Sequence, residues 1–143
     1  MSDSTKAYPN GPVAAPRRVL LIEDEANIAT AIAFILGRAG WRVSTHSDGA
    51  TALDAIVRHA PDVVVLDVML PGRSGFDVLA AIREGDRPDL PVMMLTAKGQ
   101  TKDRERAEAL GVSRFMTKPF SNQDLLDAVD GLIAPGRAVD DGR

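Results

Sequence analysis

Residues 62–79 read DVVVLDVMLPGRSGFDVL, and their pattern is the clearest indication of the fold in this sequence. Its first part, Asp62–Leu66, is almost unbroken in valine and leucine, which is typical of a strand covered on both faces. Asp67 follows at once, and Phe76 and Leu79 then lie at helical spacing. A buried strand followed by an amphipathic helix indicates a βαβ unit of a parallel sheet.

The same alternation recurs on both sides of this stretch. Four more strands are predicted from short apolar runs at Arg18–Ile22, Trp41–His46, Pro91–Leu95 and Ser113–Thr117. Helices are predicted from apolar stripes at Ile28–Ala39, Asp48–His59, Ser74–Glu84, Thr101–Leu110 and Leu125–Ile133. The fourth helix has only Ala107 and Leu110 on its apolar face, so we expect it to be the most loosely held. The pattern predicts one layered α/β domain.

Length and composition set the domain boundaries. A chain of 143 residues with 45% hydrophobic content has room for one ordinary globular domain. Residues 1–16 contain three prolines and no periodic apolar pattern, so they are predicted to be a disordered leader. Residues 134–143 are predicted to be a flexible tail, which leaves 17–133 as the domain.

Charge and cysteine content exclude several classes of function. The net charge of −3 gives no electrostatic footprint for nucleic acid, so we expect no direct nucleic-acid binding. The absence of cysteine excludes disulfides, thiolate metal sites and a cysteine nucleophile. The apolar runs are too short to span a membrane, and the first residues lack the apolar centre of a secretory signal. We therefore expect a cytoplasmic protein without a membrane partner.

Charged or reactive residues follow four of the predicted strands. In an open parallel sheet, ligands bind beyond the carboxyl ends of the strands, where the strand order reverses. If the order is 2-1-3-4-5, the first and third strands are neighbours about 4.8 Å apart, which brings Asp24 close to Asp67. The groups at the four strand ends are Glu23-Asp24-Glu25, Asp67, Thr96 and Lys118.

This combination suits a metal-assisted phosphoryl acceptor. Two carboxylates about 5 Å apart repel by roughly 3 kcal/mol at an effective dielectric constant near 20, and a cation would relieve the repulsion. Oxygen ligands without cysteine favour Mg²⁺, or Mn²⁺, over zinc. Asp67 could then attack a phosphoryl group, whose oxygens Lys118 and Thr96 could hold. Each residue alone is more simply a turn, cap or surface residue, so the prediction depends on their convergence.

Four segments resemble the receiver domains of bacterial two-component response regulators: VLLIEDE, DVVVLDVMLPGRSGFDVL, PVMMLTAK and FMTKPF. The resemblance covers residues 17–133. It implies a flavodoxin-like, doubly wound, five-stranded parallel sheet of order 2-1-3-4-5, with five helices in three α/β/α layers. It also implies that Asp67 receives phosphate from a histidine kinase or a histidine phosphotransfer protein, and loses it slowly by hydrolysis. Mg²⁺ would be held by Asp24, Asp67 and the backbone carbonyl of Met69, with Glu23 acting mainly through water.

The resemblance further implies a conformational switch. On phosphorylation Thr96 would move to hydrogen-bond the phosphoryl group, and the ring of Phe115 would turn inward. The face made by the fourth helix, fifth strand and fifth helix would then repack and control a downstream effector protein. The family also implies a cis peptide bond between Lys118 and Pro119. Without the family context, Phe115 is equally well a plain core aromatic.

The sequence departs from the family pattern in places. Glu23 stands where many members have aspartate, and Phe115 lacks the hydroxyl of the common tyrosine. The segments resemble receivers attached to winged-helix transcription factors, yet no such domain follows here, so we expect a stand-alone receiver. The familiar charged dimer is in doubt, because Ser113-Arg114 replaces an acidic pair and the last helix carries Gln123, Asp127 and Asp130.

Other functions fit the residues less well. A phosphate relay or sink without its own output is not separated from a switch by sequence. A small-molecule phosphoryl-transfer hydrolase would usually need a second aspartate two residues after the nucleophile, where Met69 stands. A flavin phosphate would be repelled by the acidic EDE segment. We therefore expect no enzyme activity beyond self-phosphorylation and autodephosphorylation.

Overall fold

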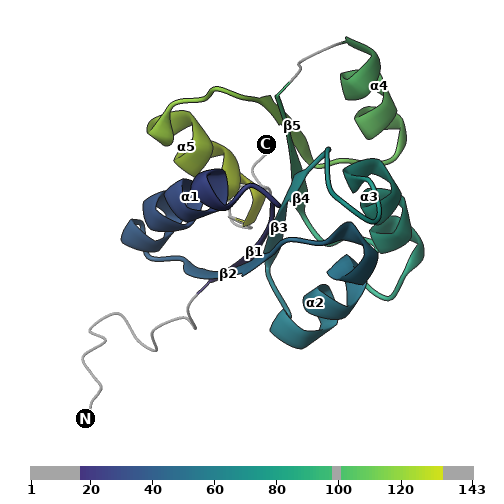
Figure 1. The fold of residues 1–143 in the computed structure, drawn as a ribbon, viewed down its shortest axis with the longest axis horizontal. Helices are drawn as coiled ribbons and strands as arrows, with labels where there is room; N and C mark the ends of the chain where they lie inside the picture. Colours follow the sequence, from purple (N-terminus) through teal and green to yellow (C-terminus); the bar gives the residue numbers. More distant parts are fainter. Residues whose placement is uncertain (1–16, 98–100, 134–143) are drawn as a thin grey trace, which may run out of the picture.

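The computed structural model describes residues 17–97 and 101–133, and it contains one parallel sheet with helices on both faces (Figure 1). The strand order is β2-β1-β3-β4-β5, which confirms the predicted flavodoxin-like topology. The strands are β1 (Arg18–Ile22), β2 (Arg42–His46), β3 (Val63–Asp67), β4 (Val92–Thr96) and β5 (Arg114–Thr117). The helices are α1 (Ala26–Arg38), η1 (Gly49–Thr51), α2 (Ala52–His59), α3 (Gly75–Glu84), α4 (Thr101–Ala109) and α5 (Asn122–Ile133). The predicted leader and tail lie outside the described residues.

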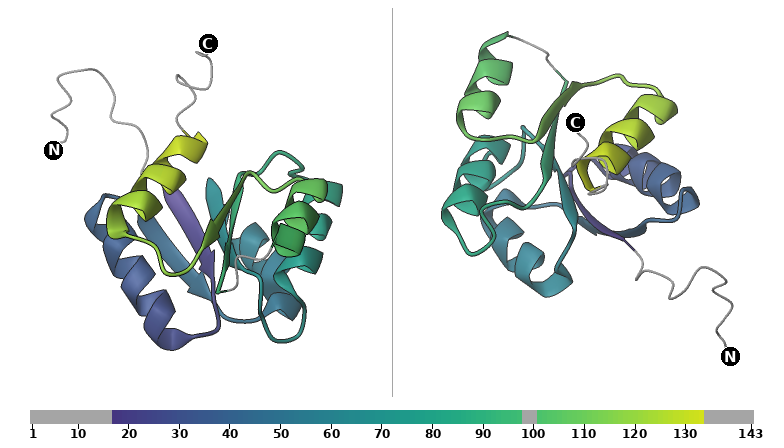
Figure 2. Two further views of the ribbon diagram at one scale, coloured as in Figure 1. Left: turned by 90° about the horizontal axis from the view of Figure 1, so that it is seen from above. Right: turned by 180° about the vertical axis from the view of Figure 1, so that it is seen from behind.

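The helices form two outer layers. Helices α1 and α5 cover one face of the sheet, and α2, α3 and α4 cover the other (Figures 1 and 2). Successive strand residues point to opposite faces, so Leu20 and Val64 join the core beneath α2 and α3, whereas Leu21 and Val65 join the core beneath α1 and α5. Every residue of β3 and β4 is buried, which confirms that the apolar runs mark strands covered on both sides.

Some element boundaries differ from the prediction. Strands β3 and β4 end one residue later than expected, on Asp67 and Thr96 themselves. The ladder continues because the N–H of Val68 donates to the carbonyl of Leu95 at 2.9 Å, beyond the predicted end of the third strand. The predicted helix from Asp48 starts instead as the 3-10 turn η1, because the Asp48 side chain accepts from the N–H of Ala50 at 2.9 Å. Asp67 and Thr96 are therefore part of the strands rather than of the loops that follow them.

Helix α4 has the thin apolar face that the sequence predicts. Ala107 is its one buried residue, and Leu110, directly after the helix, is half-buried. The helix otherwise presents charged side chains, so apolar burial contributes little to its attachment. Its predicted looseness remains a prediction.

Candidate phosphoacceptor site

The carboxyl ends of the strands bring the predicted site residues together. Glu23 and Asp24 follow β1, and Asp67 ends the neighbouring strand β3. The carboxylates of these three residues each place an oxygen within 4.8 Å of the others. The predicted approach of Asp24 to Asp67 is confirmed, and the cluster contains a third acidic group in Glu23.

Lys118 points into the same cluster from the end of β5. Its peptide bond to Pro119 is cis, as the resemblance implies, and its N–H donates to the Thr96 carbonyl at 2.7 Å. The ammonium Nζ lies 3.0 Å from Oε1 of Glu23 and 3.6 Å from Oδ1 of Asp67. Lys118 therefore lies close to the predicted acceptor Asp67, but its nearer partner is Glu23.

Glu23 is the buried counter-charge of Lys118. The residue is 3% exposed, and both of its carboxylate oxygens are engaged within the protein. Oε1 accepts from Lys118, and Oε2 accepts from the N–H of Glu25 at 3.2 Å. The predicted role of Glu23 toward a metal-bound water stays a prediction. The sequence did not indicate its pairing with Lys118.

Burial and neighbouring charge make Asp67 an unusual carboxyl group. Burial, and then the negative charge of Glu23, raise its pKa from 3.8 to about 6, although Lys118 and a hydrogen bond from the Met69 backbone act in the opposite direction. Met69 is 73% exposed, and its hydrogen bond to Asp67 comes from the backbone. The cluster thus holds more negative charge than Lys118 offsets.

We expect the substitution Glu23→Gln to lower the pKa of Asp67. The charge of Glu23 is the second largest cause of the raised value, and glutamine removes that charge while keeping a side chain of similar size. Carboxyl carbon NMR of Asp67 across pH 4 to 8, without divalent cations, would measure the change. A midpoint that stays at or above the wild-type value would contradict the described electrostatics.

The two predicted switch residues, Thr96 and Phe115, are both buried and lie on adjacent strands. Thr96 is 2% exposed and ends β4, and Phe115 is 8% exposed in the adjacent strand β5. The resemblance implies two positions for the ring, and in this structure the ring is buried and belongs to the core cluster beneath α2 and α3. The guanidinium of Arg104 in α4 lies 4.9 Å from the centre of this ring. This contact could not be predicted from the sequence.

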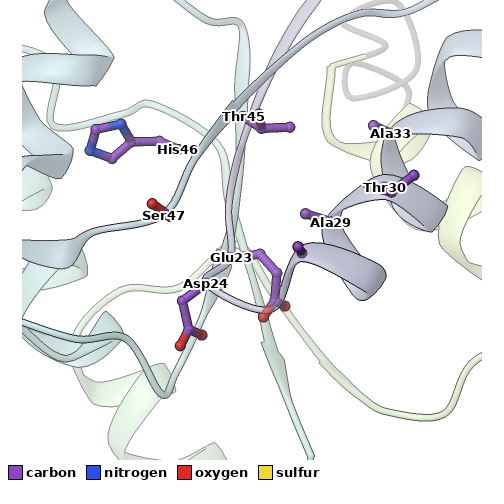
Figure 3. A pocket seen from close by; sticks show the side chains of 9 residues that line it. Glu23, Asp24, Ala29, Thr30, Ala33, Thr45, His46 and Ser47 are labelled. Atoms are coloured by element: carbon purple, nitrogen blue, oxygen red, sulfur yellow. The ribbon is translucent and has the colours of Figure 1, made fainter.

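A hollow of about 570 Å³ opens beside the acidic cluster (Figure 3). Glu23 and Asp24 lie at one end of it, with their carboxylates pointing the same way. The other walls come from small residues of α1 and from the end of β2: Ala26, Ala29, Thr30, Ala33, Thr45, His46 and Ser47. Of the predicted site residues, only Glu23 and Asp24 line this hollow; Asp67, Thr96 and Lys118 are not among its lining residues.

Comparisons with known proteins agree with this geometry. The family described as the response regulator receiver domain matches residues 19–130. The chain is 43% identical over 118 residues to the Mycobacterium tuberculosis protein "Probable transcriptional regulatory protein TcrX", covering 82% of this chain and 50% of that protein. The chain therefore spans about half the length of that curated relative.

Solved structures support the same assignment. A response regulator from Chloroflexus aurantiacus is 30% identical, with a TM-score of 0.80 over 84% of this chain and 99% of that one. The chemotaxis protein CheY4 of Vibrio cholerae is 28% identical, with a TM-score of 0.78 over 83% of this chain and 100% of that one. No helix in residues 17–97 and 101–133 is long and apolar enough to cross a membrane. On the family match, the relative and the shared fold, this chain belongs to the receiver domains of two-component response regulators.

Proposed function

We propose that this chain is a cytoplasmic, phosphorylation-dependent switch in which Asp67 accepts a phosphoryl group from a histidine kinase or a histidine phosphotransfer protein. The observation that carries the proposal is the position of Asp67. Its buried carboxylate lies at the carboxyl edge of the sheet, with two further carboxylates and the ammonium of Lys118 around it. Membership of the receiver family supports signalling by phosphorylation.

The donor set fits a hard divalent cation. Three carboxylates with oxygens within 4.8 Å of one another match the oxygen ligands that Mg²⁺ or Mn²⁺ prefers. Asp24, Asp67 and the carbonyl of Met69 would hold the ion. When bound, it would neutralise charge on the phosphoryl oxygens and orient them.

The residues of the chain supply the rest of the chemistry. An oxygen of Asp67 would attack phosphorus as the bond from phosphorus to the donor nitrogen breaks, and the donor imidazole would keep the electron pair. Nζ of Lys118 lies 3.6 Å from Oδ1 of Asp67. After transfer, this ammonium group would bind the negatively charged phosphoryl oxygens. Thr96 ends the strand next to Asp67, where its hydroxyl would hold another phosphoryl oxygen. Hydrolysis of the acyl phosphate would reset the switch, without turnover of any other substrate.

The output would pass through the face made by α4, β5 and α5 to a downstream effector protein. Thr96 and Phe115 lie on the adjacent strands β4 and β5, so movement at the acceptor can reach this face through packed side chains. The face is divided by charge: Arg114 of β5 is exposed, whereas α5 carries acidic residues and no basic one in its last turn. An effector with both signs of charge would fit it.

Acetyl phosphate tests the proposal directly. With Mg²⁺ present, the wild type is expected to gain one phosphoryl group, and Asp67→Ala is expected to gain none, because the nucleophilic oxygen is lost. Intact-protein mass spectrometry would measure incorporation, with unchanged circular dichroism showing that the variant is folded. Undiminished incorporation into Asp67→Ala would refute the assignment of the acceptor.

A further inference from the structure

Two arginine side chains of helix α4 contact aromatic rings in the rest of the domain. The guanidinium of Arg106 lies 4.3 Å from the centre of the Phe76 ring of α3, and that of Arg104 lies 4.9 Å from the Phe115 ring of β5. Both rings are buried and belong to the same core cluster. Since Ala107 is the one buried residue of α4, these two arginine contacts supply much of its attachment.

The two arginine contacts involve rings with different expected roles. Phe76 lies in the first turn of α3, is buried and belongs to the core cluster. Phe115 is the residue expected to take two positions, and it has no hydroxyl with which to find a hydrogen-bond partner in either. A guanidinium 4.9 Å from the centre of its ring is therefore a specific way to favour the buried position.

We propose that Arg104 is a positioning residue that holds Phe115 inward and thereby favours the arrangement of the site that accepts phosphate. This inference rests on the proposed function, because it concerns the regulation of the same site. If the inward ring and the phosphorylated acceptor favour each other, the coupling is reciprocal, and a group that stabilises the ring must also favour phosphorylation. Arg104 does so from the helix that borders the output face.

The typical strength of a cation–π contact predicts how much the loss of Arg104 should change the phosphorylation rate. An exposed cation–π contact typically changes an equilibrium by a factor of about 2 to 5. Loss of Arg104 is therefore expected to slow phosphorylation by acetyl phosphate by up to about that factor, without abolishing it. Arg104→Lys keeps the charge but loses the planar group that lies on the ring, so its rate should be intermediate.

Arg106→Ala provides a matched control. It removes the same charge from the same helix and breaks an equivalent ring contact, but that ring belongs to α3. The initial rate of phosphorylation would be measured for wild type, Arg104→Ala, Arg104→Lys and Arg106→Ala at equal Mg²⁺. Ring carbon and proton NMR shifts of Phe115 would be recorded in parallel, without any phosphodonor. Urea unfolding of both alanine variants would show whether they lose similar stability.

The expected result is a slower rate and shifted Phe115 ring signals in Arg104→Ala, with Arg106→Ala close to wild type in both. Equal rates in the two alanine variants, or an Arg104→Ala variant with wild-type rate and ring signals, would overturn the inference. Failure of the proposed function would look different: the wild type itself would take up no phosphate. The ring signals would then still report whether Arg104 positions Phe115.

Discussion

Replacing Asp67 with asparagine is expected to raise the free energy of unfolding by about 2 to 3 kcal/mol at pH 8 in the absence of divalent cations. Burial and the charge of Glu23 raise the pKa of Asp67 from 3.8 to about 6, so the folded protein binds this proton more tightly than the unfolded chain does. The ionised carboxylate therefore lowers stability above pH 6, and asparagine removes that cost.

The difference in stability between wild type and Asp67→Asn is expected to depend on pH. As the pH falls through about 6 toward 4, the wild type takes up the proton and recovers the stability that asparagine already has. Urea unfolding at pH 8 and at pH 4 should show a large difference between wild type and variant at pH 8, and little difference at pH 4. Asp86→Asn, at an exposed position after α3, is the control and should change little at either pH. An Asp67→Asn variant less stable than wild type at pH 8 would contradict the expectation that the ionised carboxylate of Asp67 destabilises the fold.

The substitution Gly75→Ala is expected to lower the free energy of unfolding by about 3 kcal/mol and to impair phosphorylation. Helix α3 begins at Gly75 directly against the end of β3. An added β-carbon would collide with the backbone carbonyl of Asp67 and lie 2.9 Å from Cα of Val68. The N–H of Gly75 also donates to the Val68 carbonyl at 2.8 Å, which fixes the position of the helix. The collision must displace the acceptor strand end or the helix.

Gly37→Ala is the matched control for this change. Gly37 lies in α1, where an added β-carbon would meet nothing within 4 Å, so alanine should stabilise the helix by about 0.5 to 1 kcal/mol. Chemical unfolding and acetyl phosphate incorporation would be measured for both variants. A Gly75→Ala protein with wild-type stability and wild-type incorporation would show that the close approach at Asp67 is unimportant.

Much of the fold follows from local sequence. Strands β3 and β4 are apolar at every position before their last residue, and only a strand with helices on both faces buries such a run. The same rule places the reactive residues, because parallel strands end at one edge of the sheet. The acidic cluster of Glu23, Asp24 and Asp67 could therefore be predicted before any coordinates were known.

The side-chain pairings within the site could not be predicted in this way. Lys118 and Glu23 are 95 positions apart, and whether the ammonium pairs with Glu23 or Asp67 depends on fractions of an ångström in side-chain reach. The longer side chain of glutamate places its oxygen nearer to the lysine. The contacts between α4 and the aromatic rings could not be predicted for a similar reason. In the sequence Arg104 and Arg106 resemble ordinary surface charges, and their contacts depend on how the rings of Phe115 and Phe76 pack in the folded protein.

We propose that Asp67 accepts the phosphoryl group at an acidic site that requires a divalent cation. Peptide mapping of the wild type after reaction with acetyl phosphate, with the acyl phosphate trapped by borohydride reduction, would identify the modified residue. Reduction at Asp67 alone, present with Mg²⁺ and lost when the ion is chelated, is the predicted result. Modification at another carboxylate, or equal modification of Asp67 without the ion, would contradict the account.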